Sequence, residues 1–481
     1  MPVSFEDYRR RQDGFLAMRQ FVRLGIIALV LAGGSVATPG VSRAQIFDRL
    51  QLQPPALIPM PGSQVPASRE QSPAPQPQPA PGGTREWSGE PGASGHPAMT
   101  VEAIRAAAAD FPNCIARLWP EAAKRGVTQN NFVAFTRSLT PDLRIMDLLD
   151  SQPEFTKAFW DYLDLLVSDA RIARGRELLT QYRPVFDAVE KAYGVDRYTI
   201  AAIWGVETNY GQLGGDRPVL RSTATLACVG RRQAYFKEEF LSTLEILNRG
   251  DVLPDRLKGS WAGAFGPTQF MPTSFKRYAV DFDGDGRRDV VDSVPDVIAS
   301  TANNLKLAGW APGQTWGYEV MLPERFDYLL ASRARAMTLR EWEARGVRRA
   351  NGKPFPRPSD KAYLVVPAGA RGPGFLMLHN FRAIMKYNPA EAYALAIGHL
   401  ADRLRGDPPF VQGWPRDERV LTLAERLELQ QHLARHGFDI GEPDGRLGPK
   451  SRGALMKYQV SVGLPPDGFA SASVLDLLRS R

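Results

Sequence analysis

Apolar residues recur at three- and four-residue spacing along much of the chain from about Thr100 onward, which is the pattern of helices that bury one face. Asp196 stands where an N-cap is expected, before a nearly all-apolar stretch that runs to about Thr208 and is followed by glycines. Further helices are predicted over residues 101–109, 132–139, 153–168, 169–193, 233–248, 294–308 and 389–404. Short extended stretches at 363–366 and 375–378 add a minor β part, so the chain is predicted to be mainly α.

Composition places the chain among globular proteins of more than one domain, since it has 481 residues of which 43% are apolar and 23% charged. These values exclude a coiled-coil rod, a polytopic membrane protein and a wholly disordered chain. A net charge of +8 suits nucleic acid, an anionic membrane surface or an anionic cell-wall polymer equally well. Charge alone therefore selects no partner.

The N-terminus has the order of a secretory signal. Two arginines precede a short apolar run at 24–32, and a small-residue cleavage site ends at Ala44. The run is too short to span a bilayer stably, and an uncleaved membrane anchor is the alternative. We expect a signal peptide over residues 1–44 and export to the periplasm as a soluble protein. No cysteine lies near the cleavage site, so nothing indicates a lipoprotein.

Residues 45–98 are dense in proline, glutamine and serine and carry too little apolar surface to offset the entropy of ordering. We predict a disordered linker here, which either spaces a folded domain from the export site or has no selected role. A second linker, over 406–420, separates a folded domain at 99–405 from a small helical domain at 421–481.

Cys114 and Cys228 are the only cysteines of the chain. In an exported protein an even count favours a disulfide between them, and two buried free thiols are the alternative. Two cysteines without suitably spaced histidines cannot form a structural zinc site. The sequence therefore predicts one disulfide and no zinc.

Glu207 lies at the end of the nearly all-apolar helix before Thr208. Partial burial and the negative end of the helix dipole both favour the protonated form of its carboxyl group. A protonated carboxyl group is what a general acid at a glycosidic oxygen requires. From the spacing alone, a surface glutamate at a helix end is the commoner interpretation, so the assignment depends on the surrounding motifs.

Three motifs in order form a much more specific pattern. GVETNYG contains Glu207, KGSWAGAFGPTQFMPTSF covers 258–275, and NFRAIMKYNPAEAYALAIGHLADRL covers 380–404. Together they resemble the type B lytic murein transglycosylases over about residues 100–405. The resemblance implies a lysozyme-like α+β catalytic domain, largely α-helical, that cleaves the MurNAc–GlcNAc bond of peptidoglycan.

The resemblance also implies roles for individual residues. Glu207 matches the single catalytic glutamate, which protonates the departing GlcNAc oxygen and then accepts the proton of the MurNAc 6-hydroxyl as that oxygen attacks C1. The product is a 1,6-anhydromuramoyl end. In the family a serine beside the glutamate hydrogen-bonds it, and other polar and aromatic residues line the saccharide cleft. The matching positions of this chain are Ser260, Gln269, Tyr387, Asn388 and Tyr393.

Several features of the sequence bear on this assignment. A glycosidase with two carboxylates needs them within about 5 to 10 Å of each other, and neither of the first two motifs contains a second one. Asp216, beyond three glycines, is the nearest acid in sequence and a weak candidate. The spacing of Tyr387 and Tyr393 alone would also suit core or surface aromatics. Where relatives often have a tyrosine, this chain has Asn303-Asn304, so one sugar-stacking contact is in doubt.

An acidic stretch between the motifs fits the twelve-position loop of an EF-hand. Aspartates fall at positions 1, 3, 5, 9 and 12, Gly286 stands at the sharp turn, and position 7 offers its carbonyl. Oxygen ligands at this spacing favour calcium in a structural role, and the family resemblance also implies such a loop. A solvated acidic turn is the alternative. The predicted ligands are Asp281, Asp283, Asp285, Arg287 and Asp292.

The C-terminal domain carries two Asp-Gly pairs, at 444–445 and 467–468, each opening a turn before a short helix. The segment DGRLGPKSRGALMKYQ at 444–459 resembles the small three-helix peptidoglycan-binding domain. The resemblance implies that this domain holds the enzyme on the wall and performs no chemistry.

Taken together, the motifs predict an exported lytic transglycosylase, a carbon-oxygen lyase that acts on the glycan strands of peptidoglycan. We expect a monomer with no catalytic cofactor and no affinity for nucleic acid, since no basic-aromatic motif is present. A hydrolytic muramidase and a non-catalytic cell-wall scaffold are the alternatives.

Overall fold

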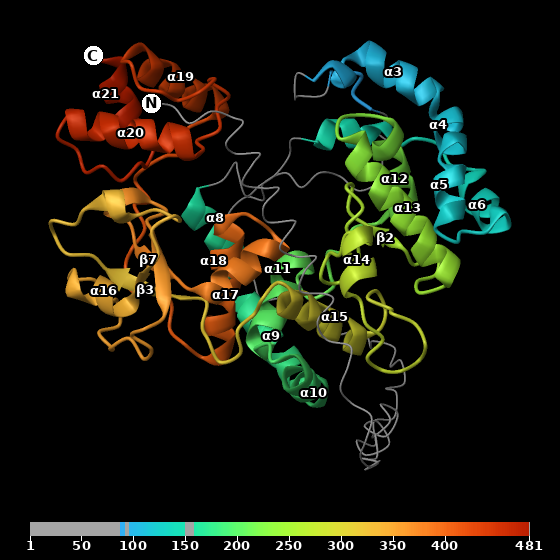
Figure 1. The fold of residues 1–481 in the computed structure, drawn as a ribbon, viewed down its shortest axis with the longest axis horizontal. Coiled ribbons are helices and arrows are strands. Elements are labelled where there is room, and N and C mark those ends of the chain that lie inside the picture. Colours follow the sequence, from blue (N-terminus) through green and yellow to red (C-terminus); the bar gives the residue numbers. More distant parts are fainter. Residues whose placement is uncertain (1–86, 92–95, 150–157, 481) are drawn as a thin grey trace, which may run out of the picture. The chain divides into compact units, whose positions relative to one another are not determined.

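The computed structural model describes residues 87–91, 96–149 and 158–480 (Figure 1). The predicted signal peptide and most of the predicted linker lie outside these residues. Ser88, near the end of that linker, donates its backbone N–H and its hydroxyl to the carboxylate of Asp147 at 3.1 and 2.6 Å. The last part of the predicted linker therefore contacts the folded domain. Within the described residues, no helix is both long and apolar enough to cross a membrane.

Four short helices begin the folded domain and pack against two longer helices from later in the chain. Thr100 and Thr128 cap two of them, each accepting a backbone N–H with its side-chain oxygen. Phe111 and Phe240, both buried, belong to the shared core. The short helices are α3 (Val101–Ala109), α4 (Phe111–Arg117), α5 (Trp119–Lys124) and α6 (Gln129–Thr136), and the longer ones are α12 (Val219–Cys228) and α13 (Gln233–Arg249).

A second group of helices is arranged around α11 (Arg197–Thr208), which contacts α9, α10, α15 and α18. A helix that is apolar on all sides must be buried in this way, and Ile200 and Ile203 on α11 are fully buried. The rest of this group is α8 (Phe159–Leu166), α9 (Asp169–Gln181), α10 (Arg183–Tyr193), α15 (Val294–Leu307), α17 (His379–Tyr387) and α18 (Glu391–Arg405). Helix α14 (Pro272–Tyr278) packs mainly against α13.

A five-stranded antiparallel sheet lies between α15 and α17 in the sequence, with strand order β4-β6-β7-β3-β5. Trp342 on α16 (Leu339–Ala344) is fully buried in its core. The strands are β3 (Gly317–Met321), β4 (Met337–Thr338), β5 (Arg348–Arg349), β6 (Lys361–Val365) and β7 (Gly374–Met377). Short 3-10 helices lie at Pro97–Met99, Leu143–Leu148, Tyr328–Leu330 and Gly369–Arg371.

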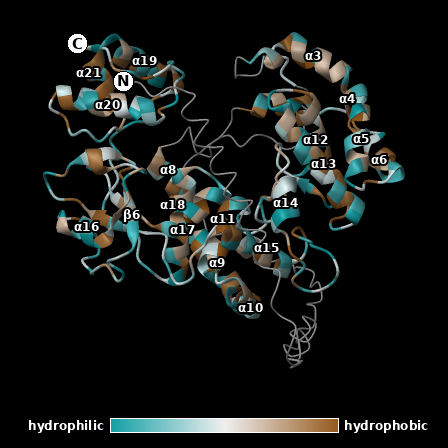
Figure 2. Cartoon of the chain, in the orientation of Figure 1, coloured by the Kyte–Doolittle hydropathy of each residue, from teal (hydrophilic) through white to brown (hydrophobic). Residues whose placement is uncertain are grey.

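The C-terminal domain consists of α19 (Leu423–Arg435), α20 (Pro449–Ser461) and α21 (Ala472–Arg479) around its own small core. Hydrophobic and hydrophilic residues alternate along these helices (Figure 2). Leu429, Leu455 and Leu475, one from each helix, are almost completely buried. The predicted three-helix domain is therefore present.

Two buried glutamines organise the Asp-Gly turns of this domain. Gln430 accepts the backbone N–H groups of Asp444 and Gly445 at 2.9 and 2.6 Å, and its amide donates to the Asp444 carboxylate at 3.2 Å. Gln459 repeats the arrangement, accepting the N–H of Gly468 at 2.8 Å and donating to Asp467 at 2.7 Å. Each turn is thus held by one uncharged side chain from a neighbouring helix.

The structure differs from the predicted helices in several places: one predicted helix is two, and α4, α5, α12, α14, α16 and α17 were not predicted. The stretch 169–193 is two helices, because Pro184 in the first turn of α10 has no N–H to bond a carbonyl of the preceding turn, and its ring clashes with that carbonyl. Helix α12 was not predicted, since its serine, threonines and valine are weak helix formers. Thr223 and Thr225 donate their hydroxyls to the carbonyls of Val219 and Arg221, both at 2.8 Å. The two buried hydroxyl groups are therefore hydrogen-bonded within the helix itself.

The predicted disulfide is present and joins Cys114 of α4 to Cys228, the last residue of α12. Its reduction is expected to lower the free energy of unfolding by about 4 to 5 kcal/mol, because the bond closes a loop of 114 residues. Thermal denaturation with and without reductant, and of the double variant Cys114→Ser, Cys228→Ser, measures the difference. Equal melting temperatures, or two alkylatable thiols in the unreduced exported protein, would contradict this expectation.

Candidate active site

Glu207 is half-buried near the C-terminal end of α11. The start of this helix is fixed by Asp196, whose carboxylate accepts the backbone N–H of Thr199 at 3.1 Å. Its end is fixed by Asn209 and Tyr210, which adopt left-handed conformations with φ of 48° and 60°. The carboxyl group is therefore carried by a buried helix with defined ends, which holds a reactive side chain more firmly than a loop does.

Two tyrosines of the third motif, the buried Tyr393 and the half-buried Tyr387, accompany this carboxyl group. Tyr393 of α18 donates its hydroxyl to Oε1 of Glu207 at 2.6 Å. Tyr387, the last residue of α17, donates its hydroxyl to the backbone carbonyl of Thr268 at 2.5 Å. Burial raises the pKa of both phenols well above the ordinary value, and the nearby Glu207 carboxylate adds to the rise. Both hydroxyls therefore stay protonated and act as donors.

The second motif forms a loop that is hydrogen-bonded to the end of α11 and to the segment that follows it. Thr208 donates its hydroxyl to the carbonyl of Pro267 at 2.6 Å and accepts the backbone N–H of Gly211 at 2.9 Å. Gln269, itself in a left-handed conformation with φ of 52°, donates its amide to the carbonyl of Gly214 at 3.3 Å. These contacts join the segment 208–214, which follows Glu207, to the segment 267–269 of the second motif.

The same two segments also pair as strands. In the short antiparallel ladder of β1 (Arg217–Pro218) and β2 (Lys258–Gly259), Arg217 lies opposite Gly259 and Pro218 opposite Lys258. A Cβ atom added at Gly215 would lie 2.3 Å from the carbonyl oxygen of Gly259, and Gly215 has a φ of +84°. Only glycine fits this close approach, which explains part of the glycine-rich sequence after Glu207.

Ser260 and Asn388, the other residues predicted for the substrate cleft, take part in local turns. Ser260 accepts the backbone N–H of Ala264 at 3.1 Å, within the second motif. Asn388 accepts the backbone N–H of Ala390 at 3.1 Å, between α17 and α18. Both residues therefore shape the backbone beside the site. The predicted hydrogen bond of Ser260 to Glu207 and the predicted contact of Asn388 with substrate stay predictions.

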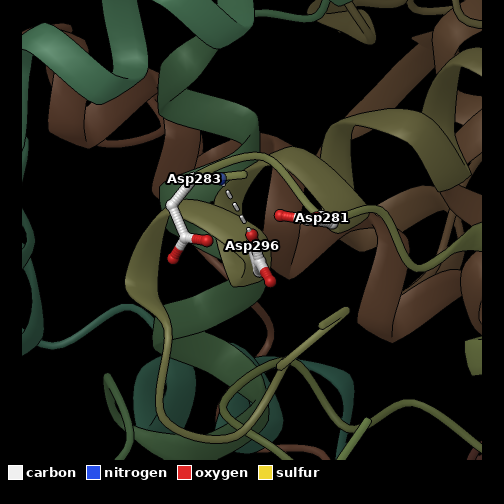
Figure 3. A group of neighbouring side chains, drawn as sticks. All are labelled: Asp281, Asp283 and Asp296. Carbon is white, nitrogen blue, oxygen red and sulfur yellow. Dashed lines mark hydrogen bonds between the residues drawn. The ribbon is translucent and has the colours of Figure 1, made fainter. Parts of the chain in front are cut away.

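Three aspartates of the acidic region gather their carboxyl groups in one place (Figure 3). Asp281, Asp283 and Asp296 each offer one oxygen, and these oxygens lie within 4.8 Å of one another. Asp296, in the first turn of α15, is fully buried and accepts the backbone N–H groups of Phe282 and Asp289 at 2.7 and 2.8 Å. Burial raises the pKa of Asp296 to about 7, and the negative charge of Asp283 adds to the rise. The two backbone N–H donors oppose this rise, because they stabilise the ionised carboxylate.

The grouped carboxylates overlap only in part with the predicted ligand set, whose other members stay predictions. Asp292, expected at position 12, forms an ion pair with Arg256, with Nε 3.0 Å from Oδ2. Asp285 pairs with the side chain of Arg287 at 3.2 Å. The group of carboxylates found in the described residues contains neither Asp285 nor Asp292, and Asp296 takes part instead.

The folded domain is similar to a known protein family. Residues 110–402, more than half of the chain, match the family described as the transglycosylase SLT domain. The chain belongs to this family. Residues 422–478 match a peptidoglycan-binding domain family. The two families predicted from the sequence motifs are therefore confirmed.

Individual relatives of this transglycosylase SLT protein agree with the family match. It is 31% identical over 266 residues to membrane-bound lytic murein transglycosylase B of Escherichia coli K12, covering 53% of this chain and 72% of that protein. It resembles SltB3 from Pseudomonas aeruginosa, solved in complex with NAG-NAM-pentapeptide, with a TM-score of 0.74 and 44% identity over 77% of this chain and 99% of that one. It also resembles the Escherichia coli lytic transglycosylase Slt35 in complex with calcium, with a TM-score of 0.52 and 27% identity over 62% of this chain and 92% of that one. The predicted lysozyme-like fold is confirmed by these similarities.

Two residues of this transglycosylase SLT domain were not predicted to take part in its sites. Thr208 follows Glu207 directly and links the end of α11 to the second motif. The tendency of threonine to hydrogen-bond backbone groups at helix ends could have indicated this role. Asp296 stands three residues after Ser293, which accepts its backbone N–H at 3.3 Å. That spacing indicates an N-terminal helix cap, and nothing in it reveals that the Asp296 carboxyl group faces the acidic loop.

Replacing Tyr393 by Phe removes the hydroxyl that donates to Glu207. The variant is expected to lose about ten- to hundredfold in kcat on purified murein, because a hydrogen bond to a charged group is worth about 1.5 to 3 kcal/mol. Tyr387→Phe is the matched control, since that buried hydroxyl donates to a neutral carbonyl and its removal costs about tenfold or less. Equal losses in the two variants would show that the Tyr393–Glu207 contact has no special role.

Proposed function

We propose that this transglycosylase SLT protein is an exported periplasmic enzyme that cleaves the β-1,4 bond between MurNAc and GlcNAc by lytic transglycosylation. The main support for the proposal is the position of the Glu207 carboxyl group. It lies at the end of a buried helix and accepts a hydrogen bond from the Tyr393 hydroxyl. The relatives support the choice of substrate, since one is named as a lytic murein transglycosylase and another was solved with NAG-NAM-pentapeptide.

In the proposed reaction, Glu207 acts first as general acid and then as general base. The protonated carboxyl group gives its proton to the glycosidic oxygen as the bond from MurNAc C1 to GlcNAc O4 breaks, so GlcNAc leaves with a 4-hydroxyl group. The carboxylate then takes the proton of the MurNAc 6-hydroxyl while O6 bonds to C1. Water is not consumed, and the new end carries a 1,6-anhydro ring.

Tyr393 supports the carboxylate stage of this cycle. Its hydroxyl donates to Oε1 of Glu207, which stabilises the ionised form and fixes the rotation of the carboxyl group. We assign the proton transfers to the other oxygen, Oε2. Tyr387 contributes indirectly, because its bond to the Thr268 carbonyl holds the second-motif loop against α17.

The C-terminal three-helix domain is proposed to hold the enzyme on glycan strands and to carry out no chemistry. Its buried polar side chains Gln430 and Gln459 are engaged in shaping the two Asp-Gly turns. The whole protein is proposed to act as a monomer, with the catalytic domain and the binding domain on one chain.

The carboxylates of Asp281, Asp283 and Asp296 fit a calcium ion by the chemistry of their donors. Calcium prefers oxygen ligands, and three carboxyl groups at this spacing, one of them fully buried, repel one another unless a cation or a proton offsets their charge. One relative was solved in complex with calcium. When bound, the ion would supply positive charge that fixes the loop between α14 and α15, with no part in the reaction.

Replacing Glu207 by Gln is expected to lower turnover of purified murein at least about a thousandfold, because the amide keeps the shape but cannot donate and recover a proton. Binding to murein should persist. Glu177→Gln, on the exposed face of α9, is the control and should retain turnover. Normal turnover by the Glu207 variant would refute the assignment, and murein binding without turnover by the unsubstituted protein would favour the scaffold.

The products of the unsubstituted enzyme distinguish transglycosylation from hydrolysis. Mass spectrometry should find muropeptides with 1,6-anhydro ends, each lighter by one water than its hydrolysed counterpart. Reducing ends formed at the same rate as bond cleavage would instead identify a hydrolytic muramidase.

Calcium is expected to raise the melting temperature of protein stripped of metal, because an ion that binds only the folded state stabilises it. The double variant Asp281→Asn, Asp283→Asn should lose this increase. Asp292→Asn is the discriminating control, since its carboxylate pairs with Arg256 outside the cluster, and this variant should keep the increase. Loss of the increase in Asp292→Asn alone would restore the twelve-position ligand set.

A further inference from the structure

The positive charge of the chain is concentrated in the segment 321–361, which includes α16 and the edge strands β4 and β5 of the five-stranded sheet. Ten residues of this segment are lysine or arginine and five are aspartate or glutamate, which gives it a net charge of +5. The whole chain has a net charge of +8. More than half of the excess positive charge is therefore carried by a segment that takes no part in the proposed reaction.

Several of these cations lie around α16. Trp342 turns one side of this helix into the core of the sheet, and Arg340 and Arg345 are exposed. At the C-terminal end of the helix, Arg348 of β5 donates its guanidinium to a carbonyl of the last turn at 2.5 Å. At the other end, Lys361 of β6 is paired in the sheet with the N-cap residue of α16. The outer side of one short helix is therefore surrounded by cations.

Few of these cations are neutralised by a carboxylate. Within the described residues, only two of the ten cations of the segment form an ion pair shorter than 4 Å. Glu341 of α16 offsets part of the remaining charge. Hydrogen bonds from Thr338 lower the pKa of Glu341, and the charges of Arg345 and Lys361 lower it further. The surface keeps a surplus of positive charge, because one carboxylate is shared by several cations.

Two features of this surface favour a phospholipid bilayer as its partner. Eight of the ten cations are arginines, whose guanidinium group can donate two parallel hydrogen bonds to a phosphate. Met321 lies directly opposite Arg348 in the pairing of β3 with β5, and it is 45% exposed. An apolar side chain among cations suits a lipid interface, where it enters the apolar layer below the phosphates. A soluble polyanion, or the carboxylates of the cell wall, would leave this methionine in water.

We propose that the outer side of α16 is a docking surface for an anionic phospholipid membrane. Its cations bind the lipid phosphates, and Met321 enters the interface between them. The docking is reversible, because it depends on a few exposed charges and one apolar side chain. The inference goes beyond the proposed function, since binding to lipid does not involve the reaction at Glu207. Docking of this kind would hold an exported enzyme at a membrane that faces the cell wall.

Binding is measured by sedimentation of the protein, purified after export, with vesicles of phosphatidylglycerol and phosphatidylcholine in equal parts, and with vesicles of phosphatidylcholine alone. The α16 variant replaces three exposed cations of the surface, by Arg340→Gln, Arg345→Gln and Lys361→Gln. The control variant replaces three exposed cations outside the segment, by Arg137→Gln, Arg183→Gln and Lys191→Gln. The two variants have the same net charge, so they differ only in where the charge is removed.

At low ionic strength the unsubstituted protein should bind the anionic vesicles and not the neutral ones. The α16 variant should bind about ten- to hundredfold more weakly, because each cation near an anionic surface strengthens binding about fivefold. The control variant should lose about threefold at most, and added salt should release the protein. Turnover of murein should be unchanged in both variants, so a failure of the proposed function would be seen separately.

Three results would overturn the inference. The first is equal binding of anionic vesicles by the α16 variant and the control variant, both with normal melting temperatures. The second is binding of the unsubstituted protein to neutral vesicles as tightly as to anionic ones. The third is a loss of binding to murein sacculi by the α16 variant while its binding to vesicles is unchanged, which would assign the surface to the cell wall.

Discussion

The burial of α11 is the constraint on which the active site depends. This helix contacts α9, α15 and α18, so its direction and rotation are set by packing on several sides at once. Its end is equally constrained, because the Tyr210 ring occupies the space left by Gly175 of α9 and Gly205 of α11, where a Cβ atom would lie 2.1 and 2.7 Å from tyrosine atoms. Glu207 has little freedom to move, and the hydroxyl of Tyr393 on α18 meets it as a result of helix packing.

The surroundings of Glu207 are built largely from backbone groups and glycine. The two loops beside it meet through the β1–β2 ladder and through side chains that bond carbonyl groups, as Thr208 and Gln269 do. Such contacts fix the loops, and the backbone at Gly214 faces open space. A polymer that carries peptides every second sugar needs this kind of space next to the cleaved bond, and a narrow, fully side-chain-lined pocket would not admit it.

The sequence was informative wherever local pattern and tertiary structure agree. The Asp196 cap, the apolar α11 and the three-helix domain could be predicted, because each leaves a short-range signal. The disulfide could be predicted from the number of cysteines in an exported chain. The acidic loop could be predicted from its spacing, and the approach of Asp296 to Asp281 and Asp283 could not, because the position of Asp296 depends on how α15 packs against the loop. Helix α12 was missed for a similar reason, since burial and hydroxyl-to-carbonyl bonds outweigh its weak helix propensity.

The two glutamines that hold the Asp-Gly turns of the C-terminal domain make its folded state insensitive to pH and salt at these turns. An amide does not titrate, so the contacts of Gln430 and Gln459 with backbone N–H groups are independent of pH and little affected by salt. The Arg446 N–H and the Gln430 amide lower the pKa of Asp444 below its ordinary value. Its contribution to stability is present above the unfolded pKa and is lost only as pH falls through that lowered value. Such a domain therefore keeps its fold in a compartment whose pH and ionic strength change with the external medium.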